Sequence, residues 1–229
     1  MNRDGKHDLK PQVQRELYFR PGYLSPARFA SYGYQLREIM SLKPETILEV
    51  GIGNGLMSYL LRKVGLKVTT LDFDESLEPD VVASVTDMPL DDNSFDVVAC
   101  FEVLEHFPFA GFAKALCEIC RVSRRMAVIS LPDHTLRFYR IEFTLPWLGH
   151  GRCSFSLPTS KASEHKFDGE HYWEIGKKGY PLERVMACIE EAGFDVVKTY
   201  RILENPTHRM FILRKSAPKT NLVSNGRHA

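Results

Sequence analysis

Three glycines at alternate positions follow a short apolar run near residue 50. Residues 47–50 are apolar except for Glu49, and Gly51, Gly53 and Gly55 come next, before a stretch with the apolar spacing of an amphipathic helix. Because glycine has no Cβ, a ligand can approach the backbone of such a loop and lie at the N-terminus of the next helix. The pattern predicts a buried parallel strand that ends at a binding loop for a flat, nucleoside-like molecule.

The spacing of the glycines argues against a dinucleotide. A dinucleotide loop of the form G-x-G-x-x-G/A needs a small residue at position 56, and that residue is leucine. A second strand, predicted at residues 67–71, ends at Asp72, about 20 positions after Gly51. A carboxylate at this place can accept both hydrogen bonds of a ribose diol. We therefore expect a nucleoside whose ribose lies on Asp72.

With the segments that follow, this loop resembles the class I S-adenosylmethionine (SAM) dependent methyltransferases, in particular the type 11 branch found in ubiquinone and menaquinone biosynthesis. The resemblance extends through Asp-Met-Pro-Leu at 87–90, Ser-Phe-Asp-Val-Val at 94–98 and Glu-Val-Leu-Glu-His at 102–106. It implies that Asp87 binds the adenine amino group and that Met88 packs on the ring. The cofactor-binding set that it implies is Glu49, Gly51, Gly53, Gly55, Asp72, Phe73, Asp87, Met88 and Phe101.

Strands and helices alternate along the chain. Helices are predicted at 26–42, 111–121 and 181–192, further strands at 95–98 and 125–130, and a terminal hairpin from 195–203 and 209–213. The predicted fold class is α/β: a Rossmann-like doubly wound sheet, mostly parallel with one antiparallel strand, and helices on both faces. The resemblance implies the seven-stranded fold of class I methyltransferases.

Composition indicates one globular domain. The chain has 229 residues, 44% hydrophobic, which is enough for a large core. We divide it into a flexible tail (1–15), a methyltransferase domain (16–215) and a disordered tail (216–229). Because 30 basic residues balance 29 acidic ones, no nucleic-acid partner is expected. An N-terminus without the apolar core of a signal peptide, and five cysteines, predict a cytoplasmic protein without a disulfide framework.

Residues 131–180 form a connection too long for simple α/β alternation. The segment is rich in aromatic side chains and follows a strand at the carboxyl edge of the sheet, so we interpret it as a substrate cap. Its large side chains are Phe138, Tyr139, Phe143, Trp147, Phe155, Phe167, Tyr172 and Trp173. Peripheral membrane contact by residues 136–148 is the alternative, since bulky apolar groups and arginines mix there. Pro146 argues against it by interrupting any long amphipathic helix.

Two sets of side chains suggest catalytic chemistry. His171 is the candidate base, because imidazole accepts protons near neutral pH and a hydroxyl acceptor must lose its proton; His134 is the second candidate. Glu102, Glu105 and His106 could suggest a metal site, but adjacent Glu105 and His106 are expected to point to different sides of a helix. No metal is therefore expected.

The resulting prediction is transfer of a methyl group from SAM to the hydroxyl oxygen of a small-molecule acceptor, with S-adenosylhomocysteine as the second product. Neither the acceptor nor the oligomeric state follows from the sequence. Two other functions fit the same motifs. A protein or peptide methyltransferase would need an open, charged groove, and a methyltransferase-like protein could bind SAM without catalysis.

Overall fold

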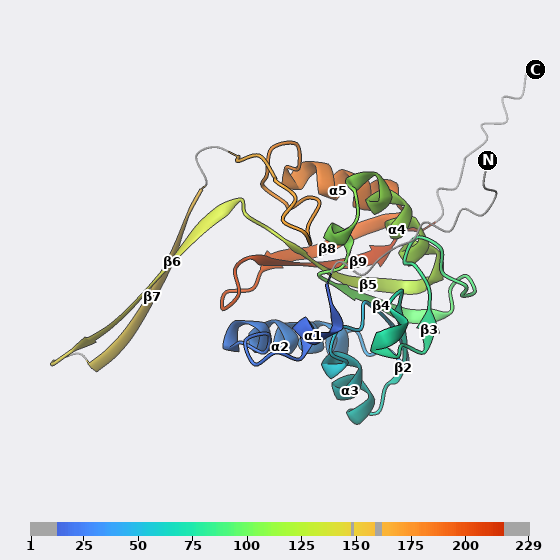
Figure 1. The fold of residues 1–229 in the computed structure, drawn as a ribbon, viewed down its shortest axis with the longest axis horizontal. Coiled ribbons are helices and arrows are strands. Elements are labelled where there is room, and N and C mark those ends of the chain that lie inside the picture. Colours follow the sequence, from blue (N-terminus) through green and yellow to red (C-terminus); the bar gives the residue numbers. More distant parts are fainter. Residues whose placement is uncertain (1–12, 148, 159–161, 218–229) are drawn as a thin grey trace, which may run out of the picture.

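The computed structural model describes residues 13–147, 149–158 and 162–217 (Figure 1). In chain order the helices and strands are α1 (Arg15–Tyr18), α2 (Pro26–Ser41), β1 (Thr46–Val50), α3 (Leu56–Lys63), β2 (Lys67–Asp72), β3 (Val81–Val82), β4 (Phe95–Phe101), α4 (Phe109–Val122), β5 (Ser123–Pro132), β6 (Leu136–Leu145), β7 (Gly149–Pro158), α5 (Leu182–Glu191), β8 (Phe194–Arg201) and β9 (His208–Lys215). Two short 3₁₀ helices, η1 (Glu75–Leu77) and η2 (Leu104–His106), complete the set.

Seven strands form one sheet in the order β3-β2-β1-β4-β5-β9-β8. The pairs from β3 to β5 are parallel, and β9 runs antiparallel to both of its neighbours. The predicted fold class is confirmed, including its single antiparallel strand. Because the chain moves from β1 toward β3 and then returns to place β4 on the other side of β1, a crevice opens at the carboxyl ends of β1 and β4.

Helices cover both faces of this sheet (Figure 1). Strand β4 illustrates why, since its side chains are buried on both sides: Val98 and Cys100 belong to the core cluster that includes residues of α4 and α5, whereas Val97 and Ala99 belong to the cluster with residues of α2 and α3. Successive residues of a strand point to opposite faces. The apolar run from Val97 to Cys100 is buried on both sides and therefore requires a layer of helices on each face of the sheet.

The long connection after β5 contains a hairpin. Strands β6 and β7 pair with each other along ten residues, and their two-stranded sheet projects away from the body of the protein (Figure 1). The later part of the connection returns to the sheet, where Ile175 pairs with the backbone of residues 132–134 and Trp173 is fully buried. The connection thus has two parts: an arm, formed by β6 and β7, and an inner segment, residues 162–180.

The chain ends lie largely outside the described residues. Of the N-terminal tail predicted at 1–15, residues 13–15 are described, and Arg15 already begins α1. Of the C-terminal tail predicted at 216–229, Ser216 and Ala217 are described, and the backbone N–H of Ser216 donates to the carbonyl of Gly193. Among the helices that are described, none is both long and apolar enough to cross a membrane.

Candidate active site

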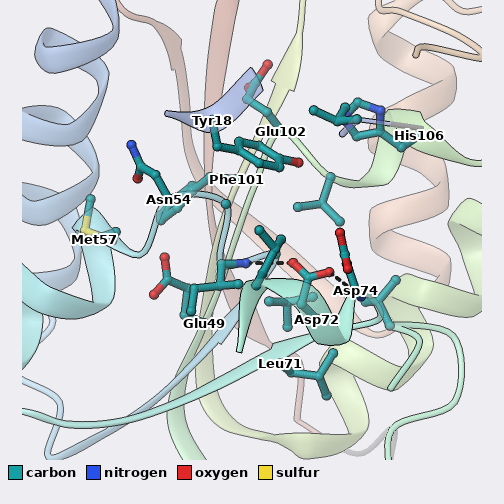
Figure 2. A pocket seen from close by; sticks show the side chains of 18 of the residues that line it. Tyr18, Glu49, Asn54, Met57, Leu71, Asp72, Asp74, Phe101, Glu102 and His106 are labelled. Carbon is teal, nitrogen blue, oxygen red and sulfur yellow. Dashed lines mark hydrogen bonds between the residues drawn. The ribbon is translucent and has the colours of Figure 1, made fainter. Parts of the chain in front are cut away.

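A cavity of about 310 Å³ lies at the crevice between β1 and β4 (Figure 2). The carboxyl ends of β1, β2 and β4 form its floor. Tyr18 at the end of α1, Tyr23 in the turn that follows and Tyr32 in α2 contribute to its wall. It contains six of the residues predicted to bind the cofactor: Glu49, Gly51, Gly53, Asp72, Phe73 and Phe101. This position is the one at which open α/β sheets bind ligands.

The glycine loop begins where β1 ends. All three glycines have positive φ angles, +82° at Gly51, +53° at Gly53 and +72° at Gly55, a region that other residues adopt only at a cost. A Cβ at Gly51 would lie 2.2 Å from Cγ2 of Val103, so this position has no space for a side chain. Gly51 and Gly53 line the cavity, whereas Gly55 lies outside it as the N-cap of α3.

Asp72, at the end of β2, is held by the backbone on both carboxylate oxygens. The N–H of Ile52 donates to Oδ2 and the N–H of Asp74 donates to Oδ1, each at 3.0 Å. The side chain lies beside the glycine loop and lines the cavity (Figure 2). Burial raises its pKa, although the backbone donors partly offset this effect. Each oxygen keeps a second lone pair for a hydroxyl donor of a ligand.

Glu49 is buried at the edge of the same cavity. Burial raises the pKa of its carboxyl to about 8, because a charged carboxylate loses its hydration there. Its Oε2 atom has no hydrogen-bond partner among the residues that the structure describes. A buried carboxyl that lines a cavity and has one oxygen without a hydrogen-bond partner is suited to receive a cationic group of a ligand, which would restore the charged form.

The positions of Asp87 and Met88 differ from the expectation. A turn in which the N–H of Asp87 donates to the carbonyl of Ser84 leaves Asp87 exposed and Met88 buried in the core. The Met88 N–H also donates to the carboxylate of Glu118 at 2.9 Å. Neither residue lines the cavity, and the wall next to β2 is formed instead by Ala83, Ser84 and Val85. Ser84 and Val85 are therefore the better candidates for contact with a base.

A second wall of the cavity is mainly polar. Glu102, which has a φ of +53°, and His106 follow β4, Glu170 and His171 come from the inner segment, and His208 begins β9. A strained non-glycine residue of this kind is often found at functional sites. Imidazoles and carboxylates together can orient and deprotonate a hydroxylated ligand. None of the large aromatic side chains of 131–180 is among the lining residues.

His171 is oriented by a carboxylate. Its Nδ1 lies 2.9 Å from Oε1 of Glu174, and its Nε2 lies 4.0 Å from Oε1 of Glu105. Burial alone would lower the pKa of His171, but the hydrogen bond and charge of Glu174 outweigh it and raise the pKa. His134, the second candidate, contacts the other oxygen of Glu174 at 3.3 Å and does not line the cavity.

The geometric reason given above against a metal site was wrong. Ligand atoms of Glu105, His106 and His171 all lie within 4.8 Å of one another. Glu105 and His106 belong to the three-residue helix η2, and the third group comes from a distant segment. Burial raises the pKa of Glu105 well above its usual value, and neither of its oxygens has a hydrogen-bond partner among the described residues. This favours a neutral carboxyl, which is a poor metal ligand.

The contribution of Tyr18 and Tyr23 to the wall of the cavity was not foreseen. The rings of Tyr18 and Tyr23 meet edge to face at 5.4 Å, and the guanidinium of Arg28 lies 4.0 Å from the centre of the Tyr23 ring. The Tyr32 hydroxyl donates to Oδ1 of Asn54 in the glycine loop at 3.4 Å. The aromatic residues at 18, 23 and 32 were the available signal, but a contact with the loop cannot be deduced from their spacing.

Comparisons with known proteins agree with this geometry. Residues 48–131 match the methyltransferase domain family (Methyltransf_11). A ubiquinone biosynthesis O-methyltransferase of Hydrogenovibrio crunogenus is 31% identical over 88 residues, 32% of this chain and 36% of that protein. Its counterpart in Xanthomonas campestris pv. campestris is 36% identical over 84 residues, 30% of this chain and 35% of that protein. The chain thus spans about a third of the length of these relatives.

A solved structure resembles the whole fold. The 1,6-didemethyltoxoflavin-N1-methyltransferase of Burkholderia thailandensis, bound to S-adenosylhomocysteine, aligns with a TM-score of 0.60, covering 88% of this chain and 85% of that one at 13% sequence identity. At this identity the likeness concerns the fold alone.

Proposed function

We propose that this chain, whose residues 48–131 match the methyltransferase domain family, is a SAM-dependent methyltransferase that acts on a hydroxyl group of a small, polar molecule. The observation that carries the proposal is a single cavity lined both by the glycine loop with Glu49 and Asp72 and by His171. The first group suits a nucleoside cofactor, and the second suits an acceptor that must lose a proton.

The residues present fit SAM. Asp72 would accept hydrogen bonds from the ribose hydroxyls, and Glu49 would pair with the ammonium group of the amino-acid part. Gly51 and Gly53 leave the backbone accessible, while Ser84 and Val85 lie where a base can pack. SAM, when bound, supplies a methyl group on a positively charged sulfur.

The chain's own contribution to transfer is positioning and removal of a proton. SAM would supply the methyl group to the acceptor oxygen and would leave as neutral S-adenosylhomocysteine. The proton of the hydroxyl passes to Nε2 of His171, because Glu174 holds the other ring nitrogen. Most of the rate increase is expected from alignment in the closed cavity.

The wall chemistry supports a polar acceptor. Histidine and glutamate side chains line the side opposite the glycine loop, and they would be left without partners by a purely apolar molecule. The large aromatic side chains of the connection, which was interpreted as a substrate cap, are not among the residues that line the cavity. The two relatives from Hydrogenovibrio crunogenus and Xanthomonas campestris are ubiquinone biosynthesis O-methyltransferases, which supports transfer to oxygen.

Binding of SAM is the first test. Replacing Asp72 with alanine is expected to weaken SAM binding by about 1–3 kcal/mol, the effect of losing hydrogen bonds to a charged group. Isothermal titration calorimetry measures this change, and Asp91→Ala, at an exposed turn, serves as the control. Unchanged affinity in the Asp72 variant would remove this residue from the site.

Transfer is the second test. Incubation with methyl-labelled SAM and a metabolite extract should place the label in a small, polar product. Label found only in protein would favour a protein or peptide methyltransferase. Tight SAM binding with no labelled product would favour a binding protein without catalysis.

Proton release is expected when SAM binds. Free Glu49 is mostly neutral at pH 7 because its pKa is about 8, whereas an ammonium group beside it favours the carboxylate. Binding at pH 7 should therefore release about one proton, and the association constant should rise nearly tenfold from pH 6 to pH 7. Calorimetry in two buffers of different ionisation enthalpy measures the release. Glu49→Gln should abolish it, and a variant that still releases the proton would contradict the assignment.

A further inference from the structure

The arm formed by β6 and β7 has one apolar face. In the observed register Tyr139 is opposite Phe155, Ile141 opposite Cys153, Phe143 opposite Gly151 and Leu145 opposite Gly149, and all of these residues point to the same side. The other side carries Phe138 near the start of β6, followed further along the arm by Glu142, Thr144 and His150. An apolar face opposite a mainly polar one is typical of a sheet that is buried on one side and exposed to solvent on the other.

Nothing in the described chain buries that face. Between 40% and 51% of each large side chain is exposed, and Trp147, in the connecting turn, is 96% exposed; the set is Tyr139, Ile141, Phe143, Leu145, Phe155 and Leu157 with Trp147. The arm extends away from the body, whose own sheet already has helices on both faces (Figure 1). An isolated two-stranded hairpin is only marginally stable in water. The arm therefore requires an external partner.

Aromatic rings on the apolar face make contacts across the two strands. The ring of Phe143 lies over Gly151, where an added Cβ would be 2.5 Å from the ring. Tyr139 and Phe155 stack with their centroids 5.3 Å apart and their planes within 16° of each other. Apolar sheet faces pack against other sheet faces, about 10 Å apart.

We propose that this face is the interface of a homodimer, in which the arms of two copies of this chain pack face to face. A two-fold axis brings two identical patches together, and the second arm offers a sheet of the same length and the same chemistry. Taking about 200 Å² for each large side chain, the exposed fractions amount to on the order of 700 Å² per chain, close to the ~800 Å² that each partner buries in a stable complex.

Charge favours a second copy over a lipid surface. The chain as a whole has a net charge of +1, so two copies repel each other little. Residues 136–158 contain three arginines and one glutamate, fewer basic residues than the clusters of about four to eight that typically bind anionic membranes. The apolar centre of the face, at Ile141 and Phe143, is the part that the second arm would cover.

Light scattering coupled to size-exclusion chromatography tests the interface on the full chain. The expected mass is twice that of one chain at concentrations of roughly 10–100 µM. Ile141→Glu should raise the dimer dissociation constant on the order of a hundredfold or more, because the two-fold axis introduces the buried charge twice. Thr144→Glu, which adds the same charge to the opposite face, should leave the dimer intact.

A second variant keeps the test decisive if Ile141→Glu aggregates. Residues 137–157 are replaced by a short glycine-serine turn, since Leu136 and Pro158 are already paired. This armless chain should be monomeric. A wild-type monomer at 100 µM would overturn the proposal, and its sedimentation with phosphatidylcholine–phosphatidylserine vesicles would identify a membrane contact instead. A dimer that persists in the armless chain would place the interface elsewhere and overturn it as well.

Discussion

Replacing His171 with glutamine is expected to slow methyl transfer by about 10²–10⁴-fold, the usual contribution of a positioned general base. SAM affinity should change far less, because the base acts on the acceptor and not on the cofactor. Single-turnover assays with labelled SAM give the rate, and calorimetry gives the affinity. His134→Gln is the matched control, since His134 contacts the same Glu174 but does not line the cavity.

The pH dependence of the rate provides an independent check. Glu174 raises the pKa of His171, and only the neutral imidazole can accept a proton. The wild-type kcat/KM should therefore fall as the pH drops through this raised pKa. In Glu174→Gln the pKa of His171 is lower, so the fall should move to lower pH. A His171→Gln variant with full turnover from pH 6 to pH 9 would show that alignment alone accounts for catalysis.

Asp133→Ala is expected to lower the free energy of unfolding by about 3–5 kcal/mol, the cost of leaving buried charges without their partner. Asp133, directly after β5, is buried and binds the guanidinium groups of both Arg201 and Arg209. Its Oδ1 also accepts the backbone N–H of Thr135 at 2.8 Å. These contacts join the start of the long connection to the β8–β9 hairpin. Urea denaturation measures the loss.

The control for this change is an ion pair on the same hairpin. Asp195 on β8 contacts Arg214 at 3.3 Å, and both side chains are more than half exposed. Asp195→Ala should therefore change the free energy of unfolding by less than about 1 kcal/mol. If Asp133→Ala is equally mild, water must reach the two arginines, and the buried cluster does not anchor the connection.

The order of strands and helices could be predicted because the signals are local. Residues 47–50 and 95–98 are apolar except for Glu49 and Asp96, a pattern that fits strands buried on both faces, and three glycines at alternate positions indicate the loop at which β1 ends. Asp72 was found for the same reason, since the end of a parallel strand beside that loop faces the same crevice. Periodicity and glycine spacing carry this information without reference to distant residues.

The position of Asp87 and Met88 could not be predicted in the same way. The turn from Ser84 to Asp87 determines which of four successive residues face the cavity. Ser84 and Val85, which line the cavity, lie three positions before the predicted residues Asp87 and Met88. The composition of the segment is the same for either placement, so it does not indicate which pair faces the cavity. Contact with Glu118 on α4, which settles the orientation of the Met88 backbone, comes from a helix about 30 residues later in the chain.

Long-range packing determined the rest. The alternating residues of β6 and β7 indicate strands. That these strands pair with each other, in a sheet separate from the seven-stranded one, depends on contacts between residues far apart in the sequence. His171 could be named from its type, whereas its placement between Glu174 and Glu105 requires the inner segment to fold back onto η2. The local sequence specifies which side chains are present and which helix, strand or loop carries them. Their convergence in one cavity depends on the burial of Trp173 and Ile175 in the core, which only the folded chain provides.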